Sequence, residues 1–211
     1  MVSAVLFDFG GVILSSPFEA FARFERDNGL PPDLIRTINA TNADHNAWAK
    51  LERSDVTIEE FCRLFEQEAA AMGHEVRGEG VLACLSGDVR PAMVEALRRI
   101  RGRLPLALLT NNMVSAGPDA DHVSELTEIM ALFDVVVESS KVGVRKPEVQ
   151  FYEIACRQLG VAPPDCVFLD DLGVNLKPAR AMGMTTIKVV DPTDALRQLE
   201  QVVGFPLSGG S

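Results

Sequence analysis

The sequence contains little cysteine and no long apolar run. Its four cysteines are widely scattered, with no CxxC pair and no histidine at metal-ligand spacing; they are Cys62, Cys84, Cys156 and Cys166. We therefore expect reduced structural thiols rather than disulfides or a zinc site. The first apolar run, residues 2–7, is short and is stopped by Asp8. Because a membrane span needs about 18 apolar residues, we expect no membrane helix, no signal peptide and a cytoplasmic location.

Positive charge is also in short supply. Lys and Arg total 20 against 30 Asp and Glu, which gives a formal net charge of −10. Such a field repels polyanions, so nucleic acid and anionic membranes are not expected as partners. A small phosphorylated substrate stays compatible, because positive charge within a pocket can outweigh the global field. With 211 residues, 47% of them hydrophobic, the chain can form one core plus an insertion, or two small domains.

Short apolar runs recur along most of the chain, each ending in polar residues or glycine; they are 4–7, 104–109, 135–137, 167–169 and 185–190. Stretches with helical spacing separate the later ones, at 91–101, 147–159 and 174–182. This alternation predicts parallel β-α-β units and an α/β fold with a doubly wound parallel sheet. Pro147, Gly160 and Gly183 stand where helix-starting and helix-ending signals are expected.

Residues 16–88, here called the helical insertion, break this alternation. They contain stretches with helical spacing and no convincing strand, at 18–28, 32–43, 45–52 and 58–72. Thr57 and Glu60 have the spacing of a capping box at the start of the last one. We expect a core domain of residues 1–15 and 89–211, and an all-helical cap at 16–88. The end of the chain, 208–211, is expected to fray.

Three carboxylates follow two of the predicted strands: Asp8 after the first, and Asp170 and Asp171 after residues 167–169. In an open parallel sheet, ligands bind beyond the carboxyl ends of the strands. Carboxylates gathered there repel one another unless a cation joins them, and hard oxygen ligands suit Mg²⁺. Each acid taken alone fits equally well as an ordinary strand-end or turn residue.

The strand at 104–109 is followed by Thr110, Asn111 and Asn112, and a cation, Lys146, stands directly before Pro147. A hydroxyl and free backbone N–H groups at a strand end can hold phosphoryl oxygens. Singly these signals are weak, because a Thr-Asn turn and a surface lysine are both common. Together they are more informative, because they follow one another along the chain in a fixed order: an acid, a hydroxyl, a Lys-Pro pair and then two adjacent acids.

In this order the four pieces resemble the four motifs of the haloacid dehalogenase-like hydrolase superfamily. The segment 8–12, Asp-Phe-Gly-Gly-Val, is similar to the first motif, Thr110 to the second, Lys146 to the third, and the Asp170-Asp171 pair to the fourth. The helical insertion lies where the family carries its C1-type cap. Its segments at 24–31 and 57–61 resemble the phosphatase-like N-terminal domain of soluble epoxide hydrolases and the related domain of acyl-CoA dehydrogenase fusion proteins.

The resemblance implies a Mg²⁺-dependent phosphatase of small phosphorylated metabolites, with a Rossmann-like sheet of strand order 3-2-1-4-5. Asp8 would be the nucleophile and form an aspartyl-phosphate. The implied magnesium ligands are Asp8, the backbone carbonyl of Gly10, Asp170 and Asp171. The implied phosphate-binding groups are Thr110, the Asn111 backbone N–H and Lys146. Neither the particular metabolite nor the oligomeric state follows from the sequence.

One position departs from the family pattern. Most of its phosphatases carry a second aspartate, a general acid and base, two residues after the nucleophile, and here that residue is Gly10. His45 and Asp88 are candidates for a replacement acid. Two other readings stay open: a non-catalytic module that binds a phosphorylated ligand, and a metal-independent 2-haloacid dehalogenase. The retained Asp170-Asp171 pair argues against the dehalogenase.

Overall fold

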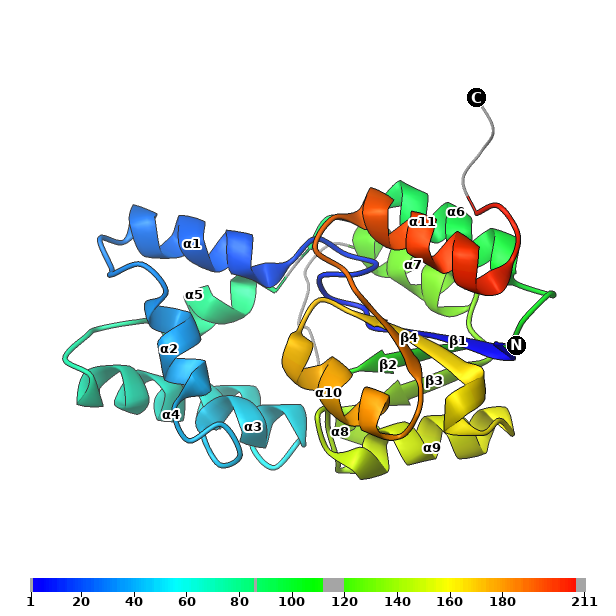
Figure 1. Ribbon diagram of the computed structural model, residues 1–211. Coiled ribbons are helices and arrows are strands. Elements are labelled where there is room, and N and C mark those ends of the chain that lie inside the picture. Colours follow the sequence, from blue (N-terminus) through cyan, green and yellow to red (C-terminus); the bar gives the residue numbers. More distant parts are fainter. Residues whose placement is uncertain (1, 86, 112–119, 208–211) are drawn as a thin grey trace.

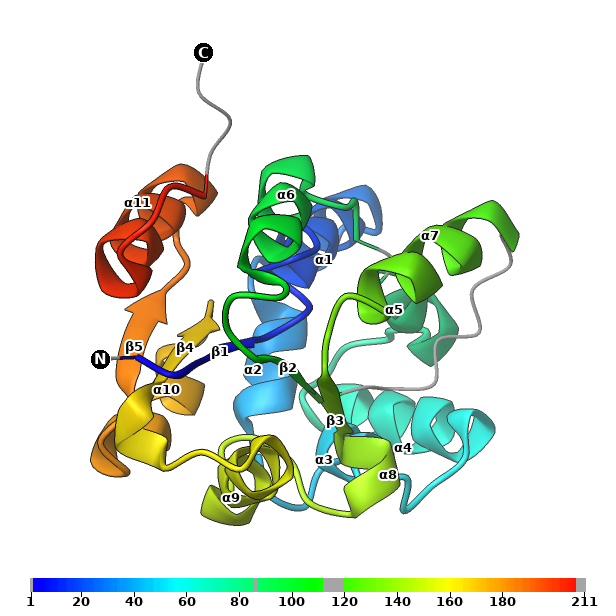
Figure 2. The same ribbon diagram turned by 90° about the vertical axis from the view of Figure 1, so that its right-hand side faces the viewer.

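A five-stranded parallel sheet forms the centre of the molecule. The computed structural model describes residues 2–85, 87–111 and 120–207, with the side chains of 120–123 left out, so Asn112 and the predicted tail lie outside it. The strands are β1 (Ala4–Phe7), β2 (Leu106–Thr110), β3 (Val135–Glu138), β4 (Cys166–Asp170) and β5 (Thr185–Lys188). Their order is β3-β2-β1-β4-β5 (Figure 2), which confirms the predicted doubly wound α/β sheet.

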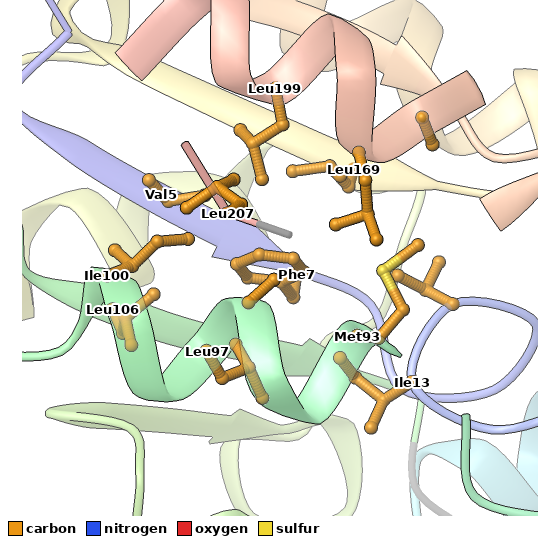
Figure 3. Close-up of a cluster of buried hydrophobic side chains, with 14 of the residues drawn as sticks. Val5, Phe7, Ile13, Met93, Leu97, Ile100, Leu106, Leu169, Leu199 and Leu207 are labelled. Atoms are coloured by element: carbon orange, nitrogen blue, oxygen red, sulfur yellow. The ribbon is translucent and has the colours of Figure 1, made fainter. Parts of the chain in front are cut away.

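Helices cover both faces of the sheet because alternate residues of its buried strands point to opposite sides. Val5 and Phe7 of β1 pack into a cluster beneath α6, α7 and α11 (Figure 3), whereas Ala4 and Leu6 pack against α9 and α10. The helices of the first layer are α6 (Pro91–Ile100), α7 (Ala120–Met130) and α11 (Pro192–Val203). Those of the second are α8 (Ser139–Val142), α9 (Val149–Leu159), the 3-10 turn η1 (Pro163–Asp165) and α10 (Gly173–Ala181).

The helical insertion lies beside the carboxyl end of the sheet (Figure 1). Its helices are α1 (Pro17–Asp27), α2 (Leu34–Ala40), α3 (Ala47–Glu52), α4 (Ile58–Ala71) and α5 (Gly78–Ala83). They enclose a hydrophobic cluster of their own, which includes Phe21, Phe61 and Phe65. The two connections to the sheet run side by side, because Leu14 and Val89 form an antiparallel bridge.

The structure confirms some of the predicted helix starts and ends and contradicts one. The capping box at α4 is confirmed, since Thr57 and Glu60 bond to each other's backbone N–H. Pro147 does not open a helix as predicted: it lies in a turn closed by the N–H of Glu148 on the carbonyl of Arg145, and α9 begins at Val149. Gly160 ends α9 in the left-handed conformation, as expected.

Helix α5 has no counterpart among the predicted elements. It contains Gly78 and Gly80, which lower helix propensity, yet both glycines allow close packing within the insertion. A Cβ at Gly78 would lie 2.6 Å from Cα of Cys62, and one at Gly80 would lie 2.5 Å from the ring of Phe24. Among the described residues, none of the helices has the length and apolar character needed to cross a membrane.

Candidate active site

Three carboxylates gather at the carboxyl end of the two central strands. Asp8 directly follows β1, Asp170 ends β4 and Asp171 comes next, and one oxygen of each lies within 4.8 Å of the others. Strands β1 and β4 are hydrogen-bonded neighbours, which explains why acids so far apart in sequence meet. Asp170 is fully buried and Asp8 nearly so. The juxtaposition expected of Asp8, Asp170 and Asp171 is therefore present.

Lys146 reaches this cluster from the segment between α8 and α9. Its Nζ lies 2.6 Å from Oδ1 of Asp8 and 2.8 Å from Oδ2 of Asp170, and the side chain is buried. Burial by itself would lower the pKa of Lys146, but the charges of Asp170 and Asp8 outweigh burial and raise it. The lysine is thus a permanent cation between two carboxylates, and the reading of Lys146 as a solvated surface residue is wrong.

The acids are costly to ionise in this place. Burial raises the pKa of Asp8 well above its usual range, with Lys146 opposing the shift and Asp170 adding to it. Burial and the charge of Asp170 raise the pKa of Asp171 to about 6. Three carboxylates against one lysine leave two negative charges in excess when all are ionised. A hard divalent cation would remove this repulsion, so the donor set fits Mg²⁺.

Two buried polar residues orient Asp170 and were missed in the sequence. The Nδ2 of Asn175, on α10, lies 3.0 Å from each carboxylate oxygen of Asp170. The hydroxyl of Tyr152, on α9, donates to the Asn175 backbone carbonyl at 2.7 Å. The available signal was an asparagine on the buried face of the helix, four residues after Asp171. Such partners fix a ligand carboxylate in one orientation.

Thr110 and Asn111 lie on the other side of Asp8. Thr110 is buried at the end of β2, whose residues pair with β1. The side chain of Asn111 binds the backbone of Lys146 from both sides: its Oδ1 accepts from the N–H at 2.8 Å, and its Nδ2 donates to the carbonyl at 3.0 Å. Asn111 thus holds the Lys146 segment through its side chain, which the sequence did not predict. The role expected from the sequence was phosphate binding by its backbone N–H.

The two glycines after Asp8 differ in their surroundings. A Cβ at Gly10 would meet nothing within 4 Å. Gly11 has a φ of +78°, and a Cβ there would lie 2.2 Å from Oδ2 of Asp171. Gly11 is therefore required for the close approach of the loop to Asp171. The guanidinium of Arg90 donates to the Gly11 carbonyl at 2.8 Å. Arg90 lies on the connection that leads from the insertion back to the sheet, and it holds the loop from there.

The two candidates for a replacement acid, His45 and Asp88, have exposed side chains. Asp88 lies in the linker, where its backbone bonds to Ser15. The insertion instead brings a different carboxylate to this region, Glu52 of α3. Burial raises the pKa of Glu52, although its hydrogen bonds and the charges of Arg145 and Lys146 oppose the shift. No sequence pattern distinguished this glutamate from the other acidic residues of the insertion.

Comparison with known families identifies the chain. A model described as haloacid dehalogenase-like hydrolase matches residues 2–183. The chain belongs to the haloacid dehalogenase-like hydrolase family. The resemblance inferred from the four motifs is confirmed.

Curated relatives include both proteins whose domains the helical insertion resembles. Acyl-CoA dehydrogenase family member 10 of Mus musculus is 33% identical over 217 residues, covering 98% of this chain and 20% of that protein. Bifunctional epoxide hydrolase 2 of Mus musculus is 32% identical over 215 residues, covering 95% of this chain and 39% of that protein. A sesquiterpene phosphatase of Aspergillus oryzae is 26% identical over 204 residues, covering 95% of this chain and 96% of that protein. This chain therefore spans well under half of the first two relatives.

Solved structures agree on the fold. A haloacid dehalogenase family enzyme of Bacteroides thetaiotaomicron, in complex with magnesium and inorganic phosphate, superposes with a TM-score of 0.60 at 18% identity. The match covers 89% of this chain and 94% of that one. At this level of identity the likeness concerns the fold, including the strand order found here.

Proposed function

We propose that this family member is a Mg²⁺-dependent phosphatase that acts on small phosphorylated metabolites through an aspartyl-phosphate on Asp8. The observation that carries the proposal is the buried contact of Lys146 with Asp8 and Asp170, beside Asp171, at the carboxyl end of the sheet. The sesquiterpene phosphatase, which this chain matches over nearly its whole length, supports phosphate chemistry.

In this proposal Asp8 attacks the phosphorus as a carboxylate, and the leaving group departs on the opposite side. Lys146 favours the ionised form of Asp8 and neutralises charge on the phosphoryl oxygens. Thr110 contributes its hydroxyl and Asn111 its backbone N–H to the same oxygens. Water then hydrolyses the aspartyl-phosphate and regenerates Asp8.

The residues proposed to hold Mg²⁺ are Asp8, Asp171, the Gly10 carbonyl and Asp170. When bound, the ion supplies positive charge that shields the nucleophile from the phosphate. The oxygens of Asp170 already accept bonds from Lys146, Leu172 and Asn175. Asp171 accepts a long bond of 3.5 Å from the Ser16 hydroxyl. Asp171 therefore has more acceptor capacity left for a bound ion than Asp170 has.

We also propose that residues 16–88 act as a cap over this site, with 1–15 and 89–211 as the core. Support comes from the separate hydrophobic cluster of the insertion and its place beside the carboxyl end of the sheet (Figure 1). A cap over the phosphate site would contact the organic part of the substrate, and this is where specificity in the family would reside.

The test is hydrolysis of p-nitrophenyl phosphate with Mg²⁺ and with a chelator, using the wild type and Asp8→Asn. We expect turnover that requires Mg²⁺ and is abolished in Asp8→Asn, which should remain folded. Phosphate-analogue binding without turnover or a trapped phosphoenzyme would instead identify a binding module. Halide release from a 2-haloacid without metal would identify a dehalogenase.

A further inference from the structure

Arg145, the residue before Lys146, points away from the sheet and into the helical insertion. One guanidinium nitrogen pairs with the carboxylate of Glu52, on α3, and another donates to the backbone carbonyl of Ala43. Both Arg145 and Glu52 are buried, with 9% and 7% of their surfaces exposed. The segment that carries Lys146 is thus attached directly to the insertion.

The same segment is held from the core by Asn111. Its side chain binds both backbone polar groups of Lys146, the N–H and the carbonyl. The contacts therefore form a connected path from Glu52 to Arg145, along the backbone to Lys146, and on to Asn111 in the core. Because Lys146 Nζ contacts Asp8, a shift of this path would move the lysine relative to Asp8.

A buried ion pair is a poor source of stability, because both charges lose their hydration. Burial raises the pKa of Glu52 even with Arg145 beside it, which shows that desolvation outweighs the attraction for this carboxylate. A solvent-exposed ion pair would join the helical insertion to the core with a smaller loss of hydration. The buried pair fixes the side chain of Arg145, the residue adjacent to Lys146, inside the insertion.

We propose that Glu52 and Arg145 are positioning residues that couple docking of the helical insertion to the placement of Lys146. With the insertion docked, Arg145 is anchored and Lys146 is held against Asp8. With the pair broken, the Lys146 segment loses its carboxylate partner in the insertion, and its backbone is held by Asn111. The kinetic consequence rests on the phosphatase function proposed above, whereas the structural coupling does not.

The chain offers a matched control in a second ion pair between the same two units. Arg53 lies 2.7 Å from Glu148, and its side chain is 19% exposed, against 37% for Glu148. Arg53 is adjacent to Glu52 and also bonds to backbone carbonyls of the insertion. Glu148 Oε1 also accepts from the backbone N–H of Arg145 at 3.4 Å. Substituting Arg53 removes a contact between insertion and core, and leaves this bond, the Glu52–Arg145 pair and the hydrogen bonds of Asn111 to Lys146 in place.

The first measurement is hydrogen exchange at the Lys146 amide, which donates to Asn111, in Glu52→Gln, Arg145→Gln, the double variant and Arg53→Gln. We expect exchange to rise by about tenfold or more in the first three, with no further rise in the double variant, and little change in Arg53→Gln. An unchanged Lys146 amide in Glu52→Gln, or an equal rise in Arg53→Gln, would overturn the coupling. If Glu52→Gln does not fold, Arg145→Lys keeps the charge but cannot span both partners, and the same criteria apply to it.

The second measurement is steady-state kinetics with p-nitrophenyl phosphate. We expect kcat to fall by about tenfold in Glu52→Gln and Arg145→Gln with little change in KM, and to stay near wild type in Arg53→Gln. A fall of equal size in Arg53→Gln would show that any loosened contact has this effect. An inactive wild type would refute the proposed phosphatase, while the amide measurement would still decide the coupling.

Discussion

Gly10 stands where most phosphatases of this family carry an acidic residue, and its surroundings leave room for one. A Cβ there meets nothing within 4 Å, and the backbone does not require glycine. Neither crowding at the Cβ position nor the backbone conformation therefore excludes an acidic residue here. The general acid and base removed by this residue is typically worth about 10²–10⁴-fold.

Gly10→Asp should accelerate breakdown of the aspartyl-phosphate, because the new carboxylate can activate the attacking water. With an activated substrate, we expect the wild type to show a burst of phosphoenzyme near the enzyme concentration. The variant should lose the burst and turn over at least about tenfold faster. Rapid-quench kinetics measures both. Gly10→Asn, of the same size but without the base, is the control, and an equal gain in it would contradict this explanation.

Gly11 is required by its neighbours as well as by its backbone. Gly11→Ala would combine the strain of a positive φ, about 1–2 kcal/mol, with a Cβ placed 2.2 Å from Asp171. Gly160→Ala is the matched control, since its φ is +69° and its Cβ meets nothing within 4 Å. We expect both to lower the free energy of unfolding, and only Gly11→Ala to weaken Mg²⁺ binding as well. Isothermal titration with Mg²⁺ checks this; equal Mg²⁺ affinity in both variants would show that Asp171 is not displaced.

At the scale of single elements, α4 depends on its first turn. Thr57 and Glu60 satisfy two backbone N–H groups that the helix leaves without partners. Thr57→Ala should lower the free energy of unfolding by about 1 kcal/mol, the usual cost of losing such a cap. Thr57→Ser keeps the hydroxyl and should stay close to wild type. Denaturant unfolding followed by circular dichroism measures the difference, and equal losses in the two variants would argue against the cap.

At the scale of the whole molecule, the acid cluster links stability to pH and metal. The folded-state pKa of Asp171 is about 6 against an ordinary 3.8. Its contribution to stability is therefore fully present below about pH 4 and is lost as the pH rises through about 6. In the proposed site Mg²⁺ would bind the ionised carboxylate, so it should raise the melting temperature more at about pH 7.5 than at about pH 5.

Thermal unfolding with and without Mg²⁺ at the two pH values tests this linkage. In Asp171→Asn the group cannot titrate, so the Mg²⁺ increment should be small and should lose most of its pH dependence. A variant that responds to Mg²⁺ and pH as the wild type does would place the metal away from Asp171.

The sequence by itself determined the sheet and which polar residues gather at its carboxyl edge. Apolar runs buried on both faces must form inner strands of a parallel sheet, and polar residues directly after them must meet at its carboxyl edge. Asp8, Thr110 and Asp170 could therefore be found from local pattern alone. The helical insertion was recognisable because its apolar spacing changes from runs to helical periodicity.

The tertiary structure decided what depends on partners distant in sequence. Helix α5 forms despite two glycines, because Cys62 and Phe24 occupy the space their side chains would fill. Asn175 turns to Asp170, and Asn111 holds Lys146, only because β4, α10 and the Lys146 segment converge. The same holds for Glu52 and Arg145, which read in sequence as ordinary surface charges. Burial and pairing are properties of the packed chain, and no local pattern encodes them.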